Sequence, residues 1–177
     1  MAKRLPDFSR QFGGPLLFRC DQARRRGTIL PLRGYRDARG AQLQTMPTKV
    51  LIVEDEVLIA METEAIVEDL GHHPVGIAAT SREALALAAA EIPDVALVDV
   101  NLADGPTGPE VGAKLADLGV AVVFITANPR MLQRRIENAI GVFDKPVADR
   151  DLAELLEYVT SRAAGRPAAP PSRLKLF

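Results

Sequence analysis

Short apolar runs in this sequence end in side chains that could do chemistry. Acidic residues follow residues 50–53 and 95–98, a threonine follows residues 120–125, and an acid and a lysine follow residues 142–143. In chain order, these side chains are Glu54, Asp55, Glu56, Asp99, Thr126, Asp144 and Lys145. Carboxylates that are brought together repel one another unless a cation neutralises them, and oxygen ligands partly open to water suit Mg²⁺. Because a lysine beside them can pair with a carboxylate or hold a phosphoryl oxygen, the combination predicts a magnesium ion and an incoming phosphate.

The apolar spacing predicts the elements that position these side chains. Strands are expected at residues 50–53, 75–78, 95–98, 120–125 and 142–143, because short β-branched apolar runs are typical of strands buried on both faces. Helices are expected at residues 59–70, 81–91, 111–118, 129–138 and 149–159, from apolar residues on one face, a capping box or a first-turn proline. Five strands alternating with five helices predict a doubly wound α/β domain with a five-stranded parallel sheet. Its ligand site is expected at the carboxyl ends of the strands.

Four motifs in this order make the sequence resemble the receiver domain of bacterial two-component response regulators. They are VLIVEDE at the first expected strand, ALVDVNLADGPTG around the third, VVFITA at the fourth and FDKPV at the fifth. Each motif alone is weak, but four of them on the right elements form a specific signal. The resemblance implies the flavodoxin-like (βα)5 fold of that family, with a receiver domain at residues 47–163.

Matched residue by residue, the resemblance implies a phosphoacceptor and a metal site. Asp99 is the expected phosphoacceptor. Mg²⁺ is expected on Asp55 and Asp99 directly, on Glu54 through water, and on the backbone carbonyl of Asn101. In this scheme Asp99 attacks the phosphorus of a phosphohistidine, while Mg²⁺ and Lys145 offset the charge on the phosphoryl oxygens.

The resemblance also implies a switch that responds to the phosphoryl group. Thr126, Ala127 and Lys145 match the positions that would bind its oxygens and draw the ends of the fourth and fifth strands inward. The family usually has an aromatic residue three positions before the lysine, where this sequence has Val142, and the stretch between Thr126 and Lys145 is shorter than usual. Both departures resemble the atypical receivers of alphaproteobacteria. They predict that the switch does not work by rotation of an aromatic ring.

These features predict a single-domain response regulator. It would accept a phosphoryl group on Asp99 from a histidine kinase or a histidine phosphotransfer protein, and then change its contacts with a downstream protein. It is not expected to be a dedicated enzyme, and no DNA-binding motif accompanies the receiver. A haloacid-dehalogenase-like phosphatase is excluded because its nucleophile follows the first strand, and dinucleotide binding because no G-x-G-x-x-G follows that strand. A phosphate-independent pseudo-receiver scaffold remains the alternative, for which Val142 leaves room.

The 177-residue chain has a formal net charge of −1, which hides a strong difference between its N-terminus and the rest. Residues 1–46 carry ten Lys or Arg and three Asp, whereas the other residues carry twelve basic and twenty acidic side chains. Residues 1–46 are therefore expected to be a disordered or artefactual basic leader. Residues 164–177, rich in proline and alanine, are expected to form a flexible tail. The lone Cys20 and the lack of a long apolar run predict a cytoplasmic protein without membrane contact.

Overall fold

The computed structural model of the chain describes residues 47–129, 132, 136–163 and 165–177. Its centre is a six-stranded sheet in the order β2-β1-β3-β4-β5-β6, in which the first five strands are parallel and β6 is antiparallel. The strands are β1 Lys49–Val53, β2 His73–Ala78, β3 Val95–Val98, β4 Ala121–Thr126, β5 Gly141–Asp144 and β6 Lys175–Leu176. The α-helices of the described residues are α1 Val57–Asp69, α2 Ser81–Ala90, α3 Gly108–Asp117 and α4 Asp149–Ala163. The predicted doubly wound α/β fold with a flavodoxin-like strand order is confirmed.

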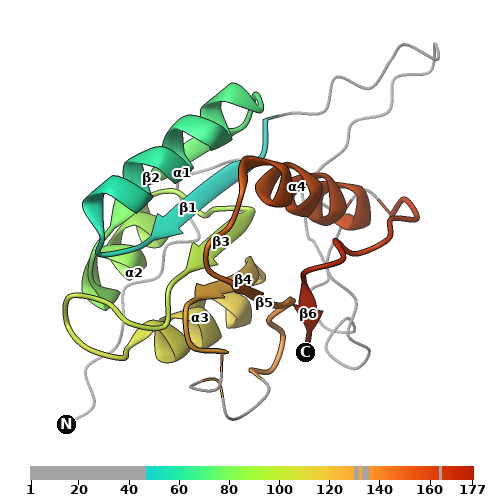
Figure 1. Cartoon of the computed structure of the whole chain (residues 1–177). Helices are drawn as coiled ribbons and strands as arrows, with labels where there is room; N and C mark the ends of the chain where they lie inside the picture. Colours follow the sequence, from blue (N-terminus) through green and yellow to red (C-terminus); the bar gives the residue numbers. More distant parts are fainter. Residues whose placement is uncertain (1–46, 130–131, 133–135, 164) are drawn as a thin grey trace, which may run out of the picture.

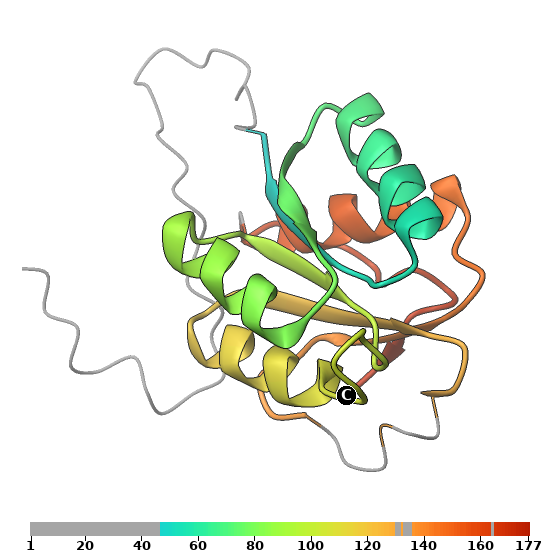
Figure 2. The same ribbon diagram turned by 90° about the vertical axis from the view of Figure 1, so that its left-hand side faces the viewer.

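Among the described residues, α1 and α4 cover one face of the sheet, and α2 and α3 cover the other (Figures 1 and 2). Beneath α1 and α4 lies one apolar cluster, which includes the fully buried Phe143 and Leu155. Beneath α2 and α3 lies a second cluster, which includes the fully buried Leu115 and Phe124. Because both faces of the parallel strands are covered, the strands are continuous apolar runs rather than alternating ones.

The start of α2 shows how local sequence fixes an element. The hydroxyl of Thr80 accepts a hydrogen bond from the backbone N–H of Glu83 at 3.3 Å. The carboxylate of Glu83 reaches back and accepts from the N–H of Ala79 at 2.9 Å. The predicted capping box is therefore confirmed, and it satisfies two N–H groups near the helix start that have no partner within the helix.

The segment between β4 and β5 differs from the helix expected at residues 129–138. Residues 130–131 and 133–135 lie outside the described residues, so that expectation is tested only at residues 129, 132 and 136–138. Leu132 donates a backbone hydrogen bond to the carbonyl of Pro129 at 3.1 Å, which closes a short turn. Asn138 has a φ of +67°, a left-handed conformation that does not continue a helix. The partly buried Leu132 and Ile136 pack against the cluster beneath α2 and α3.

The C-terminal residues also differ from the flexible tail expected at residues 164–177. Residues 175–176 form β6, which pairs antiparallel with Gly141 and Val142 of β5 and so covers the edge of the parallel sheet. Leu174 is buried in the cluster beneath α1 and α4. Gly141 leaves room for this strand, since a Cβ there would lie 2.3 Å from the carbonyl oxygen of Lys175. The segment rich in proline and alanine therefore leads the chain to the edge of the sheet, where β6 pairs with β5.

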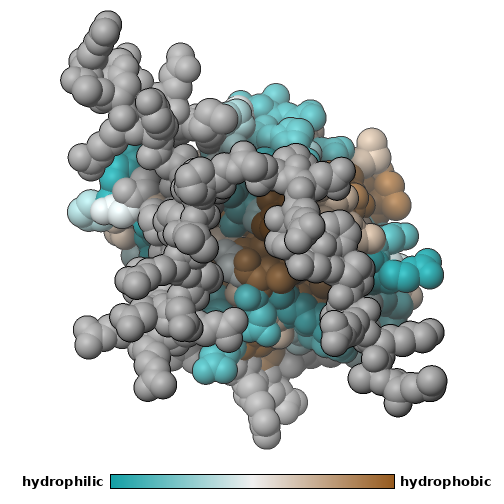
Figure 3. All heavy atoms as spheres, turned by 180° about the vertical axis from the view of Figure 1, so that it is seen from behind, coloured by the Kyte–Doolittle hydropathy of each residue, from teal (hydrophilic) through white to brown (hydrophobic). Residues whose placement is uncertain are grey.

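The surface of the described residues mixes polar and apolar side chains. The view from behind in Figure 3 shows apolar surface bordered by hydrophilic residues. The large apolar side chains with the greatest exposure are Val57, Leu58, Met61, Ile92 and Leu118. None of the helices in the described ranges is long and apolar enough to cross a membrane.

Candidate functional site

The strand register brings two acidic residues to one edge of the sheet. Val53 of β1 lies opposite Val98 of β3, so the next residues, Glu54 and Asp99, leave the sheet side by side. The backbone fixes both positions. The N–H of Asp99 donates to the carbonyl of Val53 at 2.8 Å, and the N–H of Glu54 donates to the carbonyl of Ala78 at 2.9 Å. The carboxyl ends of β1 and β3 are thus held side by side, at the edge of the sheet where ligands bind in such folds.

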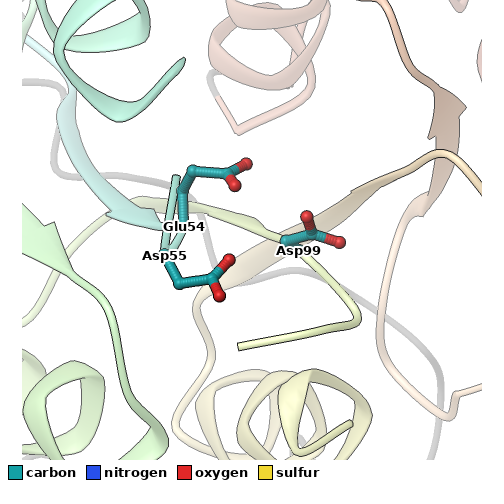
Figure 4. Close-up of side chains that lie close together, drawn as sticks. All are labelled: Glu54, Asp55 and Asp99. Carbon is teal, nitrogen blue, oxygen red and sulfur yellow. The ribbon is translucent and has the colours of Figure 1, made fainter. Parts of the chain in front are cut away.

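Glu54, Asp55 and Asp99 form a cluster of carboxylates. One oxygen atom from each lies within 4.8 Å of the other two. Figure 4 shows the three side chains around a common space, with Glu54 and Asp55 at the end of β1 and Asp99 at the end of β3. Glu54 and Asp99 are buried, at 6% and 7% exposure, whereas Asp55 is more exposed. An all-oxygen donor set with one ligand open to water fits a hard cation, and such a cluster is typical of the Mg²⁺ site of receiver domains.

Lys145 joins the acidic cluster from the end of β5. Its Nζ donates to Oδ2 of Asp99 at 2.6 Å and to Oε2 of Glu54 at 2.7 Å, and it lies 3.9 Å from Oε1 of Glu56. Its bond to Pro146 is cis. One lysine thus faces more negative charge than it can neutralise, which leaves the cluster suited to a further cation.

The pKa shifts of Glu54 and Lys145 follow from burial and hydrogen bonding. Burial raises the pKa of Glu54, and this effect outweighs the opposing hydrogen bond from Lys145. Burial alone would lower the pKa of Lys145, but the hydrogen bonds to Asp99 and Glu54 together raise it above its ordinary value. The lysine therefore stays protonated while it holds the two carboxylates.

The two oxygens of the Asp99 carboxylate have different partners. Oδ2 accepts from Lys145, while Oδ1 accepts from the backbone N–H groups of Val100 and, at 3.3 Å, Asn101. The loop that follows is pressed close to the backbone of Asp99. A Cβ on Gly108 would lie 1.9 Å from the Asp99 carbonyl oxygen, so only glycine fits there. The loop thus fixes the backbone of Asp99, and the hydrogen bonds to both carboxylate oxygens orient its side chain.

The expected switch residues lie at the ends of β4 and β5. Thr126 is buried, and its hydroxyl oxygen accepts from the N–H of Asn128 at 3.1 Å. The carbonyl of Thr126 accepts from the N–H of Lys145 at 3.0 Å, and Ala127 directly follows it in the loop. The structure therefore links Thr126 to Lys145 through the backbone, and it gives the hydroxyl a local partner instead of Asp99.

Val142 occupies the position where the family usually has an aromatic residue. It is 5% exposed and packs in the cluster beneath α2 and α3. The neighbouring Phe143 points to the opposite cluster and is fully buried. The structure therefore buries both residues. Val142 carries no ring that could rotate, and the ring of Phe143 is enclosed in the core.

Two further charged residues lie near Lys145, and the sequence pointed to only one of them. Glu56 was among the acidic residues expected to follow the first strand, and its carboxylate lies 3.9 Å from Nζ of Lys145. Arg173 lies in the expected tail, and its guanidinium donates to the carbonyls of Asp144 and Pro146, on either side of Lys145. No local pattern pointed to Arg173.

Known proteins match the chain over its folded core. The phyllosphere-induced regulator PhyR of Methylorubrum extorquens is 45% identical over 104 residues, which cover 57% of this chain and 39% of that protein. The transcriptional regulatory protein PdtaR of Mycobacterium tuberculosis is 32% identical over 121 residues, which cover 66% of this chain and 58% of that protein. The chain thus spans about two fifths to three fifths of the length of these curated relatives.

A solved structure matches over a similar region. The solution structure of the PhyR receiver domain from Erythrobacter litoralis has a TM-score of 0.58 and 34% identity, and the match covers 71% of this chain and 96% of that one. The resemblance to alphaproteobacterial receivers is therefore confirmed. Residues 50–157 match the response regulator receiver domain family, a signalling module of two-component systems. The chain belongs to the response regulator receiver domain family.

Proposed function

We propose that this chain is the receiver part of a response regulator, which accepts a phosphoryl group on Asp99. The observation that carries the proposal is the shared lysine: Nζ of Lys145 lies 2.6 Å from Asp99 and 2.7 Å from Glu54, with Asp55 in the same cluster. A buried aspartate, a lysine that contacts it and further carboxylate oxygens suited to Mg²⁺ lie together at the carboxyl edge of the sheet, and this arrangement supports the proposal. Receiver domains are signalling modules rather than dedicated enzymes, and the proposal follows that role.

The proposed donor is the phosphohistidine of a histidine kinase or a histidine phosphotransfer protein. A carboxylate oxygen of Asp99 attacks the phosphorus, an O–P bond forms, and the P–N bond to the donor imidazole breaks. The departing imidazole takes a proton from solvent, and Lys145 moves its hydrogen bond from the Asp99 carboxylate to a phosphoryl oxygen. Mg²⁺ would be held by Asp55, Asp99, the carbonyl of Asn101 and, through water, Glu54; when bound it supplies positive charge for the phosphoryl oxygens.

The proposed switch acts through the ends of β4 and β5. A phosphoryl group on Asp99 would offer oxygens to Lys145, to the hydroxyl of Thr126 and to the N–H of Ala127. Each charge-assisted hydrogen bond contributes about 1.5–3 kcal/mol, enough to bias a two-state surface and change partner affinity. Because the Thr126 hydroxyl already accepts from Asn128, its turn toward phosphate would reorganise the loop backbone. Val142 is fixed in the core, so the loop carries the change.

The test uses acetyl phosphate as donor and intact-mass measurement. With Mg²⁺ present, the chain is expected to gain about 80 Da, the mass of one phosphoryl group. Chelating the metal with EDTA is expected to abolish the adduct, because the crowded carboxylates then repel the incoming phosphate. No adduct in the presence of Mg²⁺ would contradict the proposal and favour the phosphate-independent scaffold. An adduct that persists in EDTA would contradict the role given to the metal.

An apolar patch beside the site supports a protein as the phosphodonor. The patch consists of Val57, Leu58 and Met61, which are 67%, 83% and 57% exposed in the first turns of α1. It begins one residue after Glu56, so a protein docked on it would reach the acidic cluster. Exposed apolar side chains that lie together commonly mark protein contacts. We propose that a protein with a phosphorylated histidine docks here. We place this transfer in the cytoplasm, where such donors become phosphorylated.

Leu58→Glu separates docking from chemistry. The side chain is largely exposed, so the substitution is expected to change stability by less than about 0.5 kcal/mol. The rate of phosphorylation by acetyl phosphate should stay the same, whereas the rate from a phosphorylated histidine phosphotransfer protein should fall about tenfold or more. Ile92→Glu, which alters another exposed apolar residue away from α1, is the matched control and should leave both rates unchanged. Equal loss of both rates in Leu58→Glu would place the effect in the fold.

A further inference from the structure

The C-terminal segment, residues 165–177, returns to the edge of the sheet beside the lysine. It lies beyond the region matched by the receiver family, which ends at residue 157. Its strand β6 pairs with Gly141 and Val142 of β5. Figure 1 shows β6 next to β5, with the C-terminus close by. This segment therefore contacts the strand that leads directly into Lys145.

Arg173 links this segment to the turn that carries Lys145. One guanidinium nitrogen donates to the carbonyl of Asp144 at 3.1 Å and to the carbonyl of Pro146 at 3.0 Å. These two carbonyls flank Lys145 in the sequence. The other terminal nitrogen forms an ion pair with the carboxylate of Asp151 in α4. The planar guanidinium thus contacts the backbone on both sides of Lys145, and its ion pair with Asp151 of α4 holds it in place.

Other contacts hold Arg173 in place along the sheet edge. Lys175 forms an ion pair with the carboxylate of Asp144. Phe177 donates its N–H to the carbonyl of Ile140 at 3.1 Å, and its ring lies 6.1 Å from that of Phe124. Leu174 is 7% exposed. Because apolar residues anchor the segment beyond Arg173, its position does not rest on one surface ion pair.

We infer that Arg173 is a positioning residue for Lys145; this inference rests on the proposed function. The backbone around Lys145 is fixed by its N–H, which donates to the carbonyl of Thr126 at 3.0 Å, and by the carbonyls of Asp144 and Pro146, which accept from Arg173. A lysine side chain has four flexible carbons, so its ammonium is placed reliably only when its backbone is fixed. The rate of phosphoryl transfer falls strongly when a charge that acts on the phosphoryl group is displaced even slightly. The receiver site of this chain therefore includes a residue from outside the receiver sequence.

The experiment compares three substitutions by phosphorylation kinetics with acetyl phosphate. In Arg173→Ala, the maximal rate is expected to fall about tenfold, while the acetyl phosphate concentration at half-maximal rate changes by less than about twofold. Arg173→Lys keeps the charge but cannot span two carbonyls and a carboxylate, so its rate should fall nearly as far. Arg166→Ala removes the same charge from an exposed position of the same segment and should match the wild type. A full rate in Arg173→Ala, or full rescue in Arg173→Lys, would overturn the inference.

A second measurement does not depend on phosphorylation. The N–H of Lys145 is expected to exchange with solvent faster in Arg173→Ala than in the wild type, and at the wild-type rate in Arg166→Ala. Unchanged exchange at Lys145 in Arg173→Ala would overturn the positioning role. If the wild type gains no phosphoryl group, the proposed function fails, and the exchange rates still decide whether Arg173 orders the turn.

Discussion

Asp99→Asn is expected to abolish the phosphoryl adduct and to leave the fold intact. The amide has the same shape as the carboxylate, but it is not a nucleophile toward phosphorus and cannot form the acyl phosphate. Its single carbonyl oxygen can accept from Lys145, but its NH₂ group then faces the N–H groups of Val100 and Asn101. Because the lost charge also relieves repulsion within the acidic cluster, the two effects oppose each other, and the variant is expected to remain folded without metal. The measurement is the intact mass after incubation with acetyl phosphate and Mg²⁺.

A matched control separates the nucleophile from a general loss of negative charge. Asp117 lies at the end of α3 and is exposed, so Asp117→Asn makes the same chemical change away from the cluster. This control is expected to gain about 80 Da as the wild type does. An adduct of the same size on Asp99→Asn would show that another residue accepts the phosphoryl group. Loss of the adduct in Asp117→Asn would show that the assay responds to surface charge.

The sequence predicted the acidic cluster because the site depends on strand ends. A parallel sheet aligns the carboxyl ends of its strands, so residues that follow apolar runs are brought together even when they are far apart in the chain. Glu54 and Lys145 are 91 residues apart, and their side chains meet at 2.7 Å. The same reasoning could not give the orientation of Thr126. Its hydroxyl contacts Asn128 two residues away, a local alternative that strand patterns do not describe.

The contacts of the C-terminal segment were harder to predict from the sequence, for a physical reason. Residues 164–177 have no apolar periodicity and several prolines, which favours a flexible tail when only local signals are considered. Their structure depends instead on single long-range contacts, such as Arg173 with Asp144 and Phe177 with Phe124. A two-residue strand such as β6 carries no pattern of its own and forms because β5 presents an open edge. The complementary signal was Gly141, whose missing side chain makes room for that strand.

Asp55→Ala and Lys145→Ala are expected to have opposite effects on stability without metal, although both should abolish phosphorylation. Asp55 has no ion-pair partner among the described residues, so its removal relieves repulsion with Glu54 and Asp99. The free energy of unfolding should stay the same or rise. Lys145 is only 14% exposed at its side chain, and its removal leaves two buried carboxylates without a counter-charge. Breaking such a buried pair is expected to cost about 3 kcal/mol.

Mg²⁺ then distinguishes a metal ligand from a structural residue. At a concentration about a hundred times the dissociation constant, the ion would stabilise the wild type by about 2.7 kcal/mol, and this gain should vanish in Asp55→Ala. The measurement is urea unfolding of each protein with Mg²⁺ and with EDTA. Asp55→Ala that unfolds as easily as Lys145→Ala in EDTA would make Asp55 structural, and full stabilisation of Asp55→Ala by Mg²⁺ would remove it from the metal site. The opposite signs of the two changes in the free energy of unfolding are the decisive result. When a cluster has more negative charge than its lysine can neutralise, removal of an acid stabilises the protein and removal of the lysine destabilises it.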